Sequence, residues 1–179
     1  MGRRGKAITG RGRCETKRNT MLYFEDMNVG EEERFGSYRV QRDEAIAFAS
    51  QFDPQPFHLS DDAARDSMFG RIAASGWHTA AISMRMIVDH YRETGRAMIA
   101  GMGVDELRWT RPVYPGDTLR CETQIVDTRD SKSMPEAGLV SMAVQLFNQD
   151  DIPVCRYRSA ALFGRRPRDA APARSAPAL

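Results

Sequence analysis

The chain has 179 residues and a formal net charge of +2, from 26 Lys and Arg against 24 Asp and Glu. This length is enough for one domain with a sizeable core. The positive charge is concentrated in residues 1–20, which carry seven Lys or Arg and one acid, so the rest gives no charge-based case for binding nucleic acid. No apolar run approaches the roughly 18 residues of a membrane span, so no membrane partner is expected either.

The ends of the chain differ in composition from its middle. We interpret residues 1–20 as a basic disordered extension and residues 165–179, which are rich in Pro, Ala and Arg, as a disordered tail. An organelle transit peptide and a functional start at Met21 are the alternatives for the first segment. One domain over residues 21–164 then remains.

The three cysteines indicate the redox compartment. Cys14, Cys121 and Cys155 lie far apart with no Cys-x-x-Cys pair, so neither a disulfide framework nor a zinc site is expected. Cys121 and Cys155 fall in strand-like patterns and are expected to be buried thiols. Since the basic start also lacks the apolar stretch of a signal peptide, we expect a cytoplasmic protein.

The elements between the two ends begin with helices and finish with strands. In chain order they are a strand (33–40), a helix capped by Asp43 (44–52), a proline loop (53–58), a short helix (60–65) and a long helix (76–94). After Gly95 apolar residues alternate with polar ones, over Leu119–Ile125, Val140–Leu146 and Cys155–Phe163. One buried helix followed by long antiparallel strands predicts an α+β fold in which the sheet wraps the helix.

The long helix is the most apolar element. Its apolar residues follow helical spacing and leave only a narrow polar edge, so we expect burial of Ala80, Ala81, Ile82, Met84, Met86, Ile87, Val88 and Tyr91. Ser75 is the expected N-cap, and Gly76 lets a ligand approach the free N–H groups of the first turn, where the helix dipole is positive. Such a helix start can hold a developing oxyanion.

The segment Asp53-Pro54-Gln55-Pro56-Phe57-His58 holds the candidate catalytic pair. Each proline fixes its own φ and moves the preceding residue out of the helical region, so a stiff loop holds Asp53 and His58 in a defined relation. A carboxylate only accepts hydrogen bonds, whereas imidazole can donate at one nitrogen and accept at the other. Together they can orient one water and move its proton near neutral pH. The alternative is a pair that only stabilises the loop.

Four blocks of the sequence resemble one known family. They are Tyr23-Phe24-Glu25-Asp26, the block from Asp53 to His58, Ala74-Ser75-Gly76-Trp77, and Pro112-Val113-Tyr114-Pro115-Gly116-Asp117. With these blocks the chain from about Tyr23 to Phe163 resembles the MaoC-like dehydratase family, which includes the (R)-specific enoyl-CoA hydratases. The resemblance implies a single hotdog domain, with an antiparallel sheet wrapped around a long central helix. It also implies a homodimer in which the substrate enters near the subunit interface.

The resemblance further implies a reaction and the residues that perform it. The water-activating Asp and His of the family correspond to Asp53 and His58, and the backbone N–H that binds the thioester oxygen corresponds to Gly76. Further candidates for oxyanion or substrate binding are Ser75, Trp77 and His78. For His78, packing within the buried helix is the alternative. The implied activity is hydration of a trans-2-enoyl-CoA to a 3-hydroxyacyl-CoA, or the reverse, on a CoA or carrier-protein thioester with no metal or other cofactor.

Two other functions remain open at this stage. A hotdog acyl-CoA thioesterase would use a carboxylate on or near the long helix, and the sequence has no acid between Ser75 and Val88. A non-catalytic acyl-thioester-binding domain usually lacks the Asp or the His that this chain keeps. Trp109 either borders the acyl pocket or covers the core, and Arg108 and Arg111 either meet CoA phosphates or mark an exposed strand end.

Overall fold

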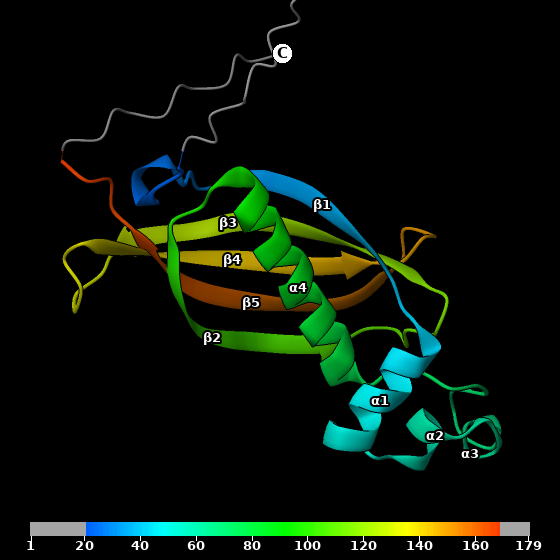
Figure 1. The fold of residues 1–179 in the computed structure, drawn as a ribbon. Helices are drawn as coiled ribbons and strands as arrows, with labels where there is room; N and C mark the ends of the chain where they lie inside the picture. Colours follow the sequence, from blue (N-terminus) through cyan, green and yellow to red (C-terminus); the bar gives the residue numbers. More distant parts are fainter. Residues whose placement is uncertain (1–20, 169–179) are drawn as a thin grey trace, which may run out of the picture.

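The structure, a computed structural model, describes residues 21–168 as one α+β domain (Figure 1). The extension expected over residues 1–20 and the part of the expected tail from residue 169 onward lie outside the described residues. No helix in the described range is long and apolar enough to cross a membrane. In chain order the elements are η1 (Phe24–Asp26), β1 (Glu32–Arg39), α1 (Arg42–Phe52), α2 (Pro56–Leu59), α3 (Asp61–Arg65), α4 (Gly76–Thr94), β2 (Met98–Trp109), β3 (Thr118–Asp130), β4 (Ala137–Phe147) and β5 (Pro153–Gly164).

The five strands form one antiparallel sheet in the order β1-β3-β4-β5-β2, and α4 lies across one face of this sheet (Figure 1). The predicted alternation along β3, β4 and β5 is confirmed, because the residues assigned to the inward face are buried there. The register places Cys121 of β3 beside Leu146 of β4, which lies beside Cys155 of β5. Both cysteines are free buried thiols, as predicted, and burial raises the pKa of Cys155 to about 11.

Helix α4 has the predicted ends but a different buried face. Ser75 caps its start by accepting a hydrogen bond from the Trp77 N–H at 3.2 Å, and Gly95 ends it in the left-handed region at φ 72°. The buried residues of the helix are His78, Thr79, Ile82, Ser83, Met86, Ile87 and Tyr91. The expected burial of Ala81 and Met84 was wrong, because both lie on the outer side.

This error has a physical reason, since α4 carries apolar residues on two sides. Trp77, Ala81, Met84 and Val88 are spaced i, i+4, i+7 and i+11 and form a second stripe, in which the first three are exposed and Val88 is half-buried. Helical periodicity shows that apolar residues share a side, but it does not show which of two apolar sides meets the sheet. We call Trp77, Ala81, Met84 and Val88 the outer stripe.

The helix before the proline loop starts earlier than the sequence predicts. Helix α1 begins at Arg42 with Gln41 as its N-cap, so the assignment of Asp43 as the cap was wrong. Asp43 lies instead in the first turn, where a carboxylate still interacts favourably with the helix dipole. Helix α3 has a side-chain cap, because Ser60 accepts a hydrogen bond from the Ala63 N–H at 3.4 Å.

Strand β2 forms one edge of the sheet and does not alternate. Its pairing with β5 is interrupted by three register shifts, and most of its residues are exposed. Exposed large apolar side chains on it include Ile99, Met102 and Val104. An edge strand has a row of unpaired backbone groups, so β2 is able to pair with another chain.

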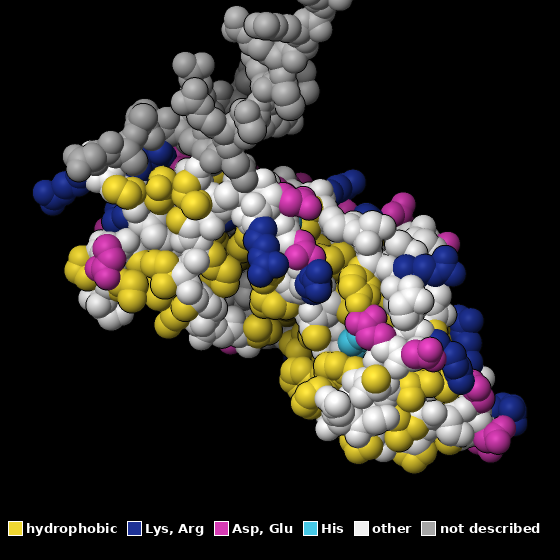
Figure 2. All heavy atoms as spheres, viewed as in Figure 1, with side chains coloured by type: hydrophobic (Ala, Val, Ile, Leu, Met, Phe, Trp, Pro, Cys, Tyr) yellow, Lys and Arg dark blue, Asp and Glu magenta, His cyan; other side chains and the backbone are white. Residues whose placement is uncertain are grey.

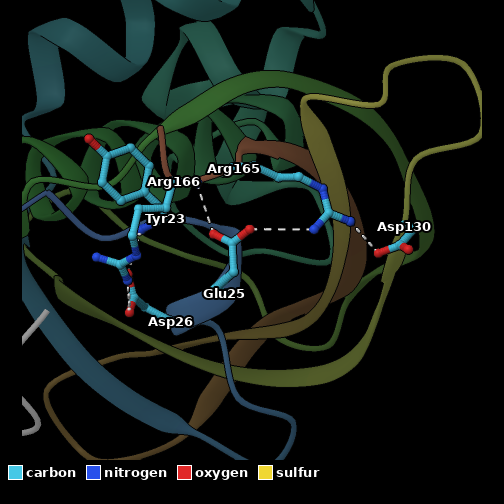
Figure 3. Close-up of polar contacts among 6 residues, drawn as sticks. All are labelled: Tyr23, Glu25, Asp26, Asp130, Arg165 and Arg166. Carbon is cyan, nitrogen blue, oxygen red and sulfur yellow. Dashed lines mark hydrogen bonds and ion pairs between the residues drawn. The ribbon is translucent and has the colours of Figure 1, made fainter. Parts of the chain in front are cut away.

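The first residues of the expected tail are held against the start of the domain (Figure 3). Arg165 forms ion pairs with Asp130 and with Glu25, the latter with 3.4 Å between Nη1 and Oε1. Arg166 Nη2 lies 2.5 Å from Asp26 Oδ1, and its backbone N–H donates to Glu25 Oε2 at 2.9 Å. The folded domain therefore continues past the boundary expected from composition.

Candidate active site

Asp53 and His58 come together where α1 ends. Asp53 follows the last residue of α1 with φ −152° and ψ 66°, outside the helical region, and Pro54 and Pro56 then lead into the single turn of α2, which carries His58. His58 Nε2 lies 3.4 Å from Asp53 Oδ2. His58 is buried, whereas the Asp53 side chain keeps 23% of its surface exposed. The two groups predicted to act as a pair are therefore adjacent, and one of them is open to solvent.

A hydrogen bond to the backbone indicates which nitrogen of His58 carries the proton. Nδ1 lies 2.7 Å from the carbonyl oxygen of Ala73, and since a carbonyl only accepts, Nδ1 is assigned the proton. In the neutral ring, Nε2 is then an acceptor that faces the acceptor Oδ2 of Asp53. Two adjacent acceptors are best satisfied by a group that can donate to both, and a water molecule is such a group.

Ser75 holds Asp53 from the other side. The Ser75 hydroxyl donates to Asp53 Oδ2 at 2.7 Å. As the cap of α4, Ser75 Oγ also accepts a hydrogen bond from the Trp77 N–H. Ser75 is fully buried. Ser75 was expected to contact the oxyanion or the substrate. Its side chain lies behind Asp53 and connects this carboxylate to the start of α4.

The pair opens into a cavity of about 590 Å³. Aromatic and other apolar side chains make up most of its walls. Its lining comprises Asp53, Gln55, Phe57, His58, Met68, Phe69, Ala74, Gly76, Trp77, Thr79, Trp109, Thr110, Arg111, Pro112 and Val113. Concave apolar cavities with a few convergent polar groups are typical of small-molecule sites.

The first turn of α4 meets this cavity at Gly76. The indole of Trp109, at the end of β2, packs directly over this glycine, and a Cβ built on Gly76 would lie 2.5 Å from Trp109 Cε2. A side chain at this position would therefore displace the indole. Trp77 and Trp109 also contact each other edge to face, with 5.3 Å between ring centroids. The predicted oxyanion residue and its neighbour Trp77 thus both lie in the cavity wall.

Like Ser75, the candidate His78 does not line the cavity. Its ring stacks on Phe48 at 4.9 Å between centroids, and its Nε2 lies 3.5 Å from Glu44 Oε1. Burial lowers the pKa of His78, although the Glu44 carboxylate opposes this shift. Gly76 and His78 lie on different sides of the helix, and the contacts of His78 with Phe48 and Glu44 place it between α1 and α4.

Sequence reasoning missed part of the cavity wall. Met68 and Phe69 come from the loop after α3, and no spacing in the sequence relates them to Asp53. The sequence left two possible locations for Trp109 and two for Arg111. In the structure both residues line the cavity. Their position depends on the pairing between β2 and β5, which no local sequence pattern predicts.

The arrangement of a five-stranded antiparallel sheet around one helix has known counterparts. A Mycobacterium tuberculosis protein with a double hotdog fold superposes with a TM-score of 0.69 at 21% identity, over 86% of this chain and 47% of that one. This likeness defines the domain as a hotdog fold. The sequence matches the family described as "MaoC like domain" over residues 26–145, and the chain therefore belongs to this family.

Two further relatives are more similar in sequence. The crystal structure of a MaoC-like dehydratase from Rhodospirillum rubrum is 42% identical, with a TM-score of 0.73 over 82% of this chain and 99% of that one. A mesaconyl-CoA hydratase from Cereibacter sphaeroides is 34% identical over 82 residues, which are 45% of this chain and 24% of the relative. The matched part is thus about a quarter of that enzyme.

Proposed function

We propose that the protein is a hydro-lyase that adds water across the double bond of a trans-2-enoyl-CoA to give a 3-hydroxyacyl-CoA, or performs the reverse dehydration. The observation that carries this proposal is the closeness of Asp53 Oδ2 and His58 Nε2, 3.4 Å apart at the wall of the cavity that Gly76 also lines. Membership of the MaoC family supports the same class of reaction, as does the mesaconyl-CoA hydratase among its relatives.

The geometry suggests how this chemistry proceeds. A water that donates to both acceptors is held with its oxygen lone pairs free to attack C3 of the enoyl group, while the Asp53 and His58 pair takes one of its protons. The N–H of Gly76 belongs to the helix start, where backbone donors have no intrahelical partner, and it stabilises the enolate oxygen that forms at the thioester. The proton is then delivered to C2. General acid–base assistance contributes about 10²- to 10⁴-fold, and one oxyanion donor about 10²- to 10³-fold.

We further propose that the protein acts as a homodimer on a thioester presented by CoA or a carrier protein. Exposed apolar residues on the edge strand β2 and on the outer stripe of α4 support an interface on that side of the molecule. A metal or redox cofactor has no step to perform in this proposal. The carrier is left open, because CoA and carrier proteins present the same pantetheine arm.

The thioesterase remains the second candidate, and one assay separates it from the hydratase. Crotonyl-CoA and a longer trans-2-enoyl-CoA are followed by the loss of enoyl absorbance, with free thiol measured in the same mixtures. We expect absorbance to fall without thiol release. Thiol release without hydration would favour the thioesterase, and binding of both thioesters with neither reaction would favour an acyl-thioester-binding domain.

Replacement of Asp53 tests the pair itself. In Asp53→Asn the amide keeps the shape of the side chain but cannot accept a proton at neutral pH, so we expect kcat to fall by about 10²- to 10⁴-fold with unchanged thermal unfolding. Asp62→Asn is the matched control, because this carboxylate is almost fully exposed on α3 and does not line the cavity. Near wild-type turnover in Asp53→Asn would show that the pair does not activate the water.

A further inference from the structure

The cavity contains one cation that the proposed reaction does not use. Arg111 is the only Lys or Arg among the described residues that line it, and Asp53 is the only acid. Asp53 already interacts with Ser75 and His58. The side-chain contact of Arg111 is a hydrogen bond from Nη1 to the Thr110 carbonyl oxygen at 3.3 Å, and no carboxylate of the described residues lies within ion-pair distance of it. Arg111 is exposed to solvent where it lines the cavity, and most of its guanidinium donors are free.

The backbone on both sides of Arg111 is fixed against the active site. Trp109 packs over Gly76, and the Val113 carbonyl accepts from the Ala74 N–H at 2.8 Å. Between these contacts, the Thr110 hydroxyl donates to the Pro153 carbonyl at 2.6 Å, and Pro112 restricts its own φ. Arg111 is thus anchored beside the segment that opens α4. An anion bound there lies close to the reacting end of a substrate.

The chemistry of an acyl thioester limits what that anion can be. The pantetheine arm is uncharged, and the phosphates of CoA lie beyond its far end, whereas Arg111 lines the cavity that holds the proposed water site. Water solvates this exposed guanidinium in the free protein, and an apolar acyl chain laid over it would remove that water without compensation. A carboxylate on the acyl group would instead form the charge-assisted, two-pronged contact that arginine favours.

We propose that Arg111 binds a carboxylate at the acyl end of the substrate, so that the preferred substrates are enoyl thioesters of dicarboxylic acids. This inference rests on the proposed function for the reaction, but it concerns binding and can be tested apart from it. A carboxylate and a phosphate both present anionic oxygens that a guanidinium can bind. CoA phosphate is therefore the other possible ligand of Arg111, and the experiment separates the two.

The catalytic arm compares fumaryl-CoA with crotonyl-CoA, which differ by a carboxylate in place of a methyl group. Both are also offered as N-acetylcysteamine thioesters, which lack phosphate. In Arg111→Gln we expect kcat/KM for the fumaryl thioesters to fall by about 10- to 100-fold with either carrier, and the crotonyl values to change little. Arg108→Gln is the matched control, because Arg108 also donates to the preceding carbonyl but does not line the cavity.

A loss confined to the CoA thioesters, whatever the acyl group, would overturn the proposal and assign Arg111 to the CoA phosphates. Equal loss or no loss for all four substrates would overturn it as well. The binding arm uses succinyl-CoA and butyryl-CoA, which have no double bond to hydrate. If the protein shows no hydratase activity, weaker calorimetric binding of succinyl-CoA alone to Arg111→Gln would still support the carboxylate site. Equal binding of both thioesters by the wild type would count against it.

Discussion

In the candidate site, one oxygen atom, Oδ2 of Asp53, contacts both Ser75 and His58. It accepts the Ser75 hydroxyl at 2.7 Å and lies 3.4 Å from His58 Nε2. A hydrogen bond from a buried hydroxyl fixes the direction of a carboxylate, and misplacement of a catalytic group by a fraction of an ångström costs rate. Ser75 is therefore a positioning residue in the proposed mechanism, acting through Asp53.

Ser75→Gly isolates this role. Glycine costs a helix cap only a few tenths of a kcal/mol relative to serine, so α4 keeps its start, but the donor to Asp53 is lost. We expect kcat to fall about 10-fold with KM little changed, and Ser75→Thr, which keeps a hydroxyl, to restore most of the rate. Steady-state kinetics of both variants check this. If the two variants are equally impaired, the serine acts by packing and not through its hydroxyl.

The sequence predicted the local part of this site and not the rest. Asp53 and His58 lie in one proline loop, and Gly76 opens a helix, so short-range rules located all three. The bond from Ser75 to Asp53 joins residues 22 positions apart. The packing of Trp109 over Gly76 depends on where an edge strand ends. Contacts of this kind are set by tertiary structure, which spacing along the chain does not contain.

At the scale of elements, the strength of the periodic signal decided what could be predicted. Strands β3, β4 and β5 have one buried face, and their alternation gave the correct inward residues. Strand β2 is exposed along most of its length and has no alternation to detect. Helix α4 was located correctly, but its two apolar sides made the choice of the buried face ambiguous.

The contact between α1 and α4 predicts a pH dependence of stability. Burial lowers the pKa of His78 below its usual 6.5, against the opposing effect of Glu44, which also accepts a hydrogen bond from Tyr38. Arg85 also lies near Glu44, and an ion pair with Asp89 balances its charge. Below about pH 6.5 the unfolded chain binds a proton that the folded chain does not, so the free energy of unfolding falls with falling pH.

His78→Gln removes this titration while it keeps a polar side chain. The variant keeps every carboxylate of the wild type, so the comparison of the two proteins isolates the His78 ring and its contact with Glu44. We expect the variant to be less stable at pH 8 because the ring no longer packs on Phe48, and to lose less stability between pH 6.5 and pH 5. Urea unfolding at pH 8, 6.5 and 5 measures this. Parallel losses in the two proteins would contradict a buried neutral imidazole.

For the whole molecule, the unexplained feature is a side with too many exposed apolar residues. Figure 2 shows apolar side chains gathered along the side where Figure 1 places β2 and α4. Ile99, Met102 and Val104 of β2 contribute to the exposed set, together with Trp77 and Met84 of the outer stripe. Monomeric proteins rarely expose large contiguous apolar patches, so a second copy of the chain is the partner proposed here.

Val104→Lys tests this assembly. Val104 is 51% exposed in the single chain, so lysine costs the isolated domain little, whereas in an interface it would bury a charge without a partner. We expect wild type to have about twice the mass of one chain by light scattering after gel filtration, and Val104→Lys to shift toward the single-chain mass.

Val29→Lys is the matched control, because Val29 is 61% exposed and lies just before β1, at the opposite edge of the sheet. A wild-type protein that elutes with the mass of one chain would contradict the dimer. If both lysine variants remain dimeric, the interface does not include the middle of β2, and the outer stripe of α4 becomes the surface to change next.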